Sequence, residues 1–364
     1  MNIDILVKHD DLRSTRSVER ALPPLADGLV RLRIDHFALT ANNVTSAAVG
    51  DAMKYWQFFP SEVAGFGRVP VWGFADVTAS RADGVAAGER FYGYFPISRE
   101  VDLQPARVSA RGFHDAAAHR AGLATIYNQY VRSASDTPAN EALVALLRPL
   151  FSTSFLIDDF LADNAFFGAR TVVLSSASSK TAYGTAFCLM RRRASAGAVR
   201  IVGLTSAANL AFTQRLGCYD EVVSYDAVSR LDRSEPVVYV DFNGSAALRA
   251  AVHTHFDAQL AYSCSVGASH WSELQPGSAA ALPGPRATLF FAPARAEKRS
   301  ADWGAAALQQ RIGEAWAAFM RPVVAADPPW LTVVRGHGTA DIERVWRELV
   351  DGGGDPQQGH ILSL

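Results

Sequence analysis

The chain has 364 residues, 49% of them hydrophobic, and a formal net charge of −1 at pH 7. This length and apolar content predict about two domains with separate cores. The near-neutral charge argues against a nucleic-acid partner, and no apolar run approaches the roughly 18 residues that span a bilayer. Residues 1–11 lack the basic start and apolar block of a secretory signal, so we expect a cytoplasmic protein without a membrane partner.

The three cysteines, Cys188, Cys218 and Cys264, are far apart in the sequence and lie in apolar or mixed contexts. This pattern predicts buried free thiols in a reducing compartment. There is no CxxC, no HExxH and no cluster of His and Cys, and so the sequence predicts no metal site.

The first hundred residues read as short strands separated by turns. Strands are expected at residues 28–39, 71–77 and 90–96, with a turn at residues 83–89. The pattern predicts a compact, mostly β domain that resembles a barrel.

A polar break at residues 40–45 is expected to be a loop at the edge of a pocket. Asn42 and Asn43 in it either form a turn or contact a substrate. A group of aromatic residues follows, which either fills the core or forms the wall of a substrate pocket. Its members are Tyr55, Trp56, Phe58 and Phe59.

Residues 114–124 are compatible with helical turns, and residues 133–138 look like a linker that follows Tyr127. From residue 140 onward, helical and strand patterns alternate. Helices are expected at residues 141–163 (with a break near Ser152), 180–193, 207–216, 245–255, 303–319 and 339–349. Strands are expected at residues 172–174, 199–204, 221–225, 236–242, 259–266, 286–293, 331–334 and 359–362. The alternation in the middle of the chain predicts a doubly wound parallel sheet.

The rest of the chain is organised around residues 171–193, which read as a strand, a turn of small polar residues and a helix. The first amides of a helix lack partners within it and favour an anion. The residues placed to bind one are Ser176, Ser178, Ser179, Lys180 and Thr181. The alternative is an ordinary strand-to-helix turn with a serine as N-cap.

The glycines of known phosphate-binding turns are absent here. Ser179-Lys180-Thr181 resembles the end of an ATP-binding loop, but neither glycine of that loop is present. At the spaced positions of the dinucleotide fingerprint stand Ser176, Ser179 and Ala182, which are all small enough to allow close approach of the backbone.

The second strand of this region ends without a carboxylate. NAD sites usually carry Asp or Glu there for the ribose hydroxyls, whereas this chain has Thr205 and Ser206. With Lys180, these hydroxyls favour NADP over NAD, although Lys180 is also explained as a surface residue. Loops at the same edge of the sheet add Asn243, Gly244 and Val266.

Several segments carry a resemblance to a known superfamily. They are residues 83–94, 173–186, 205–223 and 359–362. In these segments the chain resembles the medium-chain dehydrogenase/reductase superfamily, on its zinc-free quinone oxidoreductase and enoyl reductase side. Residues 37–59, 263–271 and 290–299 more narrowly resemble the DUF2855 type.

The resemblance implies an α/β protein with a GroES-like β-barrel substrate domain, residues 1–135 rejoined by 322–364, and a Rossmann dinucleotide-binding domain, residues 136–321. It implies NADP(H)-dependent, zinc-independent hydride transfer to an enone, an enoyl thioester or a quinone-like small molecule. By position, Tyr55 matches the proton donor of the enoyl reductases, with Tyr127 second. The expected substrate contacts are Asn42, Asn43, Trp56, Phe58, Tyr127, Trp271 and Phe291.

Two departures from the superfamily leave rival interpretations open. The fingerprint glycines are missing, and Asn209 stands where NADP-binding relatives often carry Lys. The chain is therefore either a reductase, a catalytically inactive NADP-binding sensor, or a structural protein without a cofactor. Residues 289–291 are apolar enough to pair across a homodimer.

Overall fold

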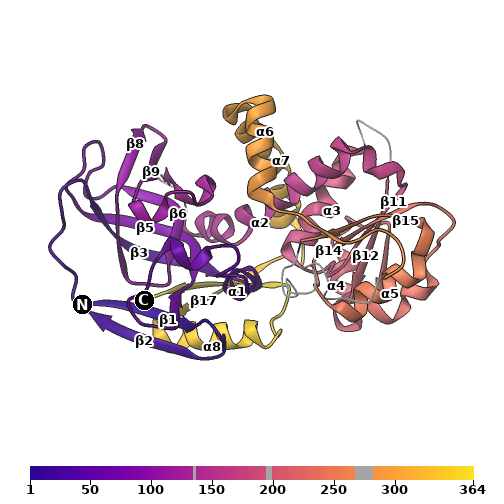
Figure 1. Cartoon of the computed structure of the whole chain (residues 1–364), viewed down its shortest axis with the longest axis horizontal. Coiled ribbons are helices and arrows are strands. Elements are labelled where there is room, and N and C mark those ends of the chain that lie inside the picture. Colours follow the sequence, from indigo (N-terminus) through magenta and orange to yellow (C-terminus); the bar gives the residue numbers. More distant parts are fainter. Residues whose placement is uncertain (134–136, 194–198, 267–281) are drawn as a thin grey trace. The chain divides into compact units, whose positions relative to one another are not determined.

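The computed structural model describes residues 1–133, 137–193, 199–266 and 282–364. The chain forms two compact units (Figure 1), an N-terminal unit of Met1–Pro149 with Thr332–Leu364 and a central unit of Leu150–Leu331. The first change of unit falls inside α2 (Pro138–Asp163), whereas the sequence placed it after residue 135; the second falls before Thr332 rather than before residue 322. Within the described ranges, no helix is long and apolar enough to cross a membrane.

The N-terminal unit is built from two sheets. The smaller has the order β2-β1-β4, and the larger has the order β17-β18-β3-β5-β6-β10-β9-β8, with β7 also paired to β3. The strands of the smaller sheet are β1 (Asn2–Lys8), β2 (Thr15–Arg20) and β4 (Phe66–Arg68). Those of the larger are β3 (Val30–Leu39), β5 (Pro70–Ser80), β6 (Arg90–Pro96), β7 (Glu100–Leu103), β8 (Pro105–Ser109), β9 (Gly112–Asp115), β10 (Gln129–Arg132), β17 (Thr332–His337) and β18 (Gln358–Ser363).

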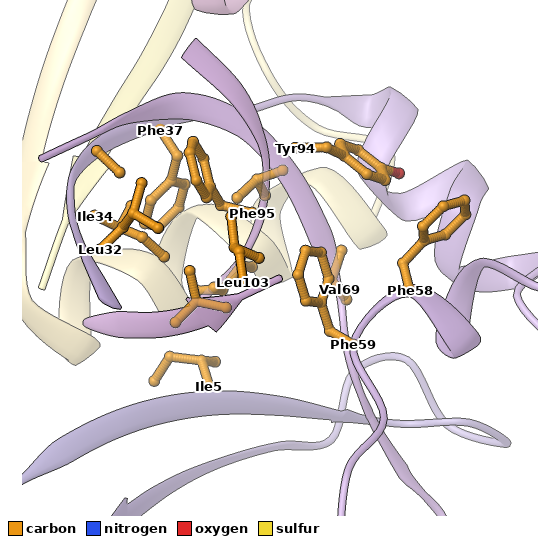
Figure 2. Packing of buried hydrophobic residues seen from close by; sticks show 14 of the residues in the cluster. Ile5, Leu32, Ile34, Phe37, Phe58, Phe59, Val69, Tyr94, Phe95 and Leu103 are labelled. Carbon is orange, nitrogen blue, oxygen red and sulfur yellow. The ribbon is translucent and has the colours of Figure 1, made fainter. Parts of the chain in front are cut away.

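The end of the chain completes this unit. β18 pairs antiparallel with β3 and parallel with β17, and α8 (Gly338–Val350) covers the core with Ile342, Val345 and Trp346. The Trp346 indole Nε1 donates to the carbonyl of Leu12 at 2.7 Å, which satisfies the one polar atom of this buried side chain. Figure 2 shows part of the core, in which side chains from β1, β3, β6 and β7 meet the aromatic pair Phe58 and Phe59.

Two segments of the N-terminal unit differ from the expectation. The polar break is the helix α1 (Ala41–Ala48), because Thr40 and Asn43 form a capping box that starts it. The expected helical turns near His114 are strand β9 followed by the short 3₁₀ helix η2 (Ala118–Arg120). β9 contains no alanine and pairs with β10, whereas the alanines that suggested a helix begin only at Ala116.

The central unit is a parallel six-stranded sheet with the order β13-β12-β11-β14-β15-β16. Its strands are β11 (Thr171–Leu174), β12 (Arg200–Thr205), β13 (Glu221–Ser224), β14 (Val237–Asp241), β15 (Leu260–Ser265) and β16 (Thr288–Leu289). Numbered along the chain, this is the order 3-2-1-4-5-6 of a doubly wound dinucleotide-binding fold. Its helices are α3 (Lys180–Arg192), α4 (Leu210–Arg215), α5 (Ala246–Phe256), α6 (Ala292–Trp303) and α7 (Ala305–Ala325), and Figure 1 shows helices on both faces.

The central unit also differs from the expectation in two places. α2 continues past Ser152 without the expected break. Two residues later, the Ser154 hydroxyl lies within hydrogen-bond distance of the Leu150 carbonyl in α2 and the Thr181 carbonyl in α3, so its polar group has partners inside the helical packing. The expected strand at residues 286–293 shrinks to the two residues of β16, because α6 begins at Ala292 with a proline in its first turn, where proline is compatible with a helix.

Candidate functional site

The turn after β11 is held by a buried carboxylate at the end of β14. Asp241 Oδ1 accepts from the Ser175 hydroxyl at 2.9 Å and from the amides of Asn243 and Gly244. Its Oδ2 accepts from Arg249 Nε and Nη2 at 3.1 and 3.0 Å. Asp241 and Arg249 are both buried. Through its bonds to Ser175 and to the amides of Asn243 and Gly244, the Asp241 carboxylate fixes the turns after β11 and β14 to each other, and Arg249 compensates its charge.

Ser176 has a left-handed backbone conformation, with φ at +45°, at a position where the fingerprint has glycine. Such a conformation costs energy for a residue that carries a Cβ. Asn243 Nδ2 donates to the Ser176 hydroxyl and to the Tyr225 hydroxyl, both at 3.2 Å. The two hydroxyls are 3.4 Å apart, and this polar triangle joins the turns after three strands of the sheet.

The start of α3 has the features of an anion-binding helix terminus. Ser179 is the N-cap and its hydroxyl accepts from the Ala182 amide at 3.4 Å, while Ala182 is fully buried. Ser178 is buried, and its hydroxyl accepts from Thr205 Oγ1 at 3.3 Å and from Asn209 Nδ2 at 3.2 Å. An incoming anion therefore meets backbone amides and partly exposed side chains rather than Ser178.

The structure brings the predicted cofactor residues together at one edge of the parallel sheet. Ser176, Ser178, Ser179, Lys180 and Thr181 follow β11, Thr205 and Ser206 end β12, Asn243 and Gly244 follow β14, and Val266 follows β15. The sequence did not predict that Tyr225 contributes to this edge, or that Asn209 donates a hydrogen bond to Ser178 there. Tyr225 is the last residue of the expected third strand, and the carboxyl end of that strand lies at the same edge of a parallel sheet.

A second polar feature lies in the N-terminal unit, where the two tyrosines expected as proton donors meet. The hydroxyl oxygens of Tyr55 and Tyr127 are 3.2 Å apart, on the 3₁₀ helices η1 (Tyr55–Phe58) and η3 (Thr125–Asn128). Both side chains are half-buried, and the Phe58 ring packs against both. Burial raises the pKa of Tyr55 and that of Tyr127, so both hydroxyls stay protonated at neutral pH.

The other expected substrate contacts lie in varied surroundings. Asn42 is exposed on α1, whereas Asn43 is buried, accepts from Thr40 and donates to the Pro70 carbonyl at 2.9 Å. Trp56 is a core residue that stacks on His9 with ring centroids 4.6 Å apart. Phe291 is half-buried at the N-cap of α6 in the central unit, and Trp271 lies outside the described residues.

The three cysteines are buried free thiols, as the sequence predicts. Burial raises the pKa of each thiol, that of Cys218 to about 12, and so none is a reactive thiolate at neutral pH. In the described ranges, Asp35, His36 and Glu141 are close enough to hold a metal ion. Arg90 already donates to both carboxylates at 2.7–2.8 Å, and we assign the group a structural role.

A cavity of about 510 Å³ lies at the opposite edge of the parallel sheet, where the strands begin. Its walls include the ion pairs Arg193–Asp220 and Arg200–Glu221. Ligands of such sheets bind at the carboxyl ends of the strands, and so this cavity has no part in the site described here.

Solved structures share this architecture over the whole chain. CurA from Vibrio vulnificus in complex with NADPH matches with a TM-score of 0.60 and 13% identity, covering 99% of this chain and 98% of that one. A quinone oxidoreductase from Pseudomonas syringae matches with a TM-score of 0.57 and 13% identity, covering 99% and 100%. The yhdH oxidoreductase from Salmonella enterica in complex with NADP matches with a TM-score of 0.52 and 14% identity, covering 100% of both chains.

These matches define the fold class. The chain has the fold of the medium-chain dehydrogenases/reductases, with a GroES-like domain and a Rossmann domain. The model of the DUF2855 family, described as proteins of unknown function, matches residues 37–355, and the chain belongs to that family. No curated protein matches the chain.

Proposed function

We propose that the chain is an NADP(H)-dependent, zinc-independent oxidoreductase that reduces an enone, an enoyl thioester or a quinone-like substrate by hydride transfer. The observation that carries this proposal is the carboxyl edge of the parallel sheet, where an anion-binding helix start and a strand end without a carboxylate lie side by side. NADP(H) supplies the hydride when it is bound; the protein supplies position, a dry environment and a proton donor.

The turn after β11 fits a pyrophosphate group despite its missing glycines. Residues 175–179 carry only methyl or hydroxymethyl side chains, so the backbone remains open to close approach. Ser176 already has the left-handed conformation that the tight turn requires. The α3 dipole and the side chains of Lys180 and Thr181 would add to the attraction.

Selection of NADP over NAD would depend on the end of β12. Thr205 and Ser206 offer hydroxyls, and Asn209 Nδ2 is held near them by the Ser178 hydroxyl. No acidic residue follows β12 before Arg215, so a 2′-phosphate would meet no repulsion from this loop. Thr205 and Ser178 are buried, and Ser206 and Asn209 are the more accessible members.

We further propose Tyr55 as the proton donor, with Tyr127 as its hydrogen-bonding partner. A neutral phenol donates a proton only if its conjugate base is stabilised, and burial opposes that for Tyr55. The Tyr127 hydroxyl at 3.2 Å is placed to donate a compensating hydrogen bond to the oxygen that loses its proton.

The rival function is that of a catalytically inactive NADP-binding sensor. The observation in its favour is that Ser176, Ser179 and Ala182 stand at the positions where the dinucleotide fingerprint has glycine. Anaerobic incubation with NADPH and a panel of enones, enoyl thioesters and quinones, followed at 340 nm, separates the two. The reductase proposal predicts oxidation of NADPH that depends on one class of acceptor. Binding of NADPH without any such oxidation would instead identify a sensor.

A further inference from the structure

We propose that Arg120 is a positioning residue, whose buried guanidinium holds together the two short helices that carry Tyr55 and Tyr127. The expected effect of Arg120 on catalysis rests on the proposed function, whereas the contacts that it makes are independent of that function.

Neither short helix has the means to fix its tyrosine alone. η1 and η3 contain four residues each, and single 3₁₀ turns have poor hydrogen-bond geometry and an unfavourable nucleation free energy. η1 also begins after Lys54, which has a left-handed backbone with φ at +61°. The 3.2 Å approach of the two hydroxyls must therefore be set by contacts from elsewhere in the unit.

Arg120 supplies such contacts to the segment of Tyr127. Its Nη1 donates to the carbonyl of Tyr127 at 3.3 Å and to Asn128 Oδ1 at 3.2 Å. Its Nη2 donates to the Tyr130 hydroxyl at 3.2 Å, and that hydroxyl donates onward to the Tyr94 carbonyl at 2.6 Å. The planar fork thus ties the last residues of η3 to strands β10 and β6.

The same guanidinium faces the segment of Tyr55. Its carbon lies 4.5 Å from the ring centroid of Phe59 and 5.6 Å from that of Phe58, the last residue of η1. Cations over aromatic rings are attracted most strongly when both are removed from water, and Arg120 is only 2% exposed. The neighbouring His119 adds a hydrogen bond from its ring to the Phe58 carbonyl at 3.2 Å.

The charge of Arg120 is compensated within the protein. Its Nε lies 2.8 Å from Asp115 Oδ2, and both side chains are buried. Asp115 Oδ1 in turn accepts the amides of Gln104 and Ala117. Arg120 is therefore paired with a buried carboxylate, and both of its terminal nitrogens donate to protein acceptors. A lysine would keep the charge but lacks the planar fork, and its single nitrogen cannot pair with Asp115, bond to the Tyr127 carbonyl and lie over the Phe59 ring at once.

The test compares Arg120→Lys with Arg132→Lys. Arg132 is a matched control because it also pairs with a carboxylate, donates to backbone carbonyls and lies over a ring, that of Phe91, without contacting η1 or η3. The first readout is ¹⁹F NMR of 3-fluorotyrosine placed at position 55, with and without Tyr127→Phe. The second is kcat and KM for NADPH in the acceptor assay.

We expect Tyr127→Phe to shift the ¹⁹F signal in the wild-type and Arg132→Lys proteins but not in Arg120→Lys, where the hydroxyls have separated. We expect kcat of Arg120→Lys to fall on the order of tenfold, with KM for NADPH unchanged. A signal in Arg120→Lys that still responds to Tyr127→Phe would overturn the proposal.

The protein could show no turnover, while its ¹⁹F signal responds to Tyr127→Phe in the wild type and not in Arg120→Lys. That result would support the role of Arg120 and would count only against the proposed reductase activity. If Arg120→Lys does not fold, the double variant Asp115→Asn/Arg120→Gln removes both buried charges together and is tested in the same way. If the ¹⁹F signal of the folded double variant still responds to Tyr127→Phe, the proposal is contradicted in the same way.

Discussion

The turn after β11 and the tyrosine pair of the N-terminal unit are built on opposite principles. The turn joins regular elements, and its fixed groups are buried: Ser175 donates to Asp241, and Thr205 donates to Ser178. The tyrosines belong to single-turn helices, and their hydroxyls lie on half-buried side chains. Recognition by backbone amides depends little on which small side chain is present, whereas proton donation depends on one oxygen atom at one place.

The largest effect is expected where the turn is fixed by buried charge. Asp241→Ala removes the carboxylate that the buried Arg249 pairs with and the acceptor of the Ser175 hydroxyl and two amides. We expect a loss of about 3 kcal/mol in the free energy of unfolding, measured by urea denaturation. Asp226→Ala is the control, since Asp226 is exposed near the same sheet edge. A loss below about 1 kcal/mol would show that the turn is fixed in another way.

The tyrosine pair is tested by removing one oxygen. We expect Tyr55→Phe to lower kcat on the order of a hundredfold with little change in KM for NADPH, because loss of a proton donor affects the chemical step. Tyr92→Phe serves as the control, since Tyr92 stacks on Trp72 within the same group of rings. Equal kcat values for Tyr55→Phe and Tyr92→Phe would remove Tyr55 from the mechanism.

The cofactor preference of the turn region is tested by adding a charge. Ser206→Asp places a carboxylate directly after β12, where it repels a 2′-phosphate and can accept from ribose hydroxyls. Titration calorimetry should give at least about a tenfold loss in affinity for NADPH and a smaller change for NADH. Parallel losses for both cofactors would mean that the residue acts on the fold rather than on the 2′-phosphate.

The smallest effect concerns the pH dependence of the ring cluster. Burial raises the pKa of Tyr94 well above its usual value of 10.0, so folding favours its protonated form. This stabilisation is complete below pH 10 and is lost as the pH rises above it. Just above pH 10, Tyr94→Phe should make the fall in unfolding free energy shallower, by at most about 1.4 kcal/mol per pH unit. An unchanged slope would mean that Tyr94 ionises as readily in the folded chain as in the unfolded one.

The difference between the two regions also explains what the sequence could predict. Strand periodicity and the alternation of strands with helices predict a parallel sheet. Since the carboxyl ends of parallel strands meet at one edge, this places residues 176–181, 205–206 and 243–244 there, and the structure confirms the parallel sheet. The buried role of Asp241 and the approach of Tyr225 depend on contacts across strands, which local patterns do not contain.

The N-terminal unit was less predictable for the same physical reason. Its large sheet pairs strands that are far apart in sequence, such as β3 with β18. The segment near His114, where helical turns were expected, is strand β9 and pairs with β10. The position of Tyr55 came from a resemblance rather than from periodicity. Its meeting with Tyr127 depends on Arg120, whose burial among aromatic rings leaves no periodic signal in the sequence.

The central claim is that the edge formed by β11, β12 and β14 binds NADP(H). The most direct test is thermal unfolding of the full chain with NADPH, NADH, NADP⁺ and NAD⁺. A ligand that binds only the folded state raises stability by about 2.7 kcal/mol at a hundredfold excess over its dissociation constant. The account predicts a clear rise in Tm with NADPH and little with NADH. No rise with any of the four nucleotides would contradict it, and the turn of Ser176 and Ser179 would then hold no pyrophosphate.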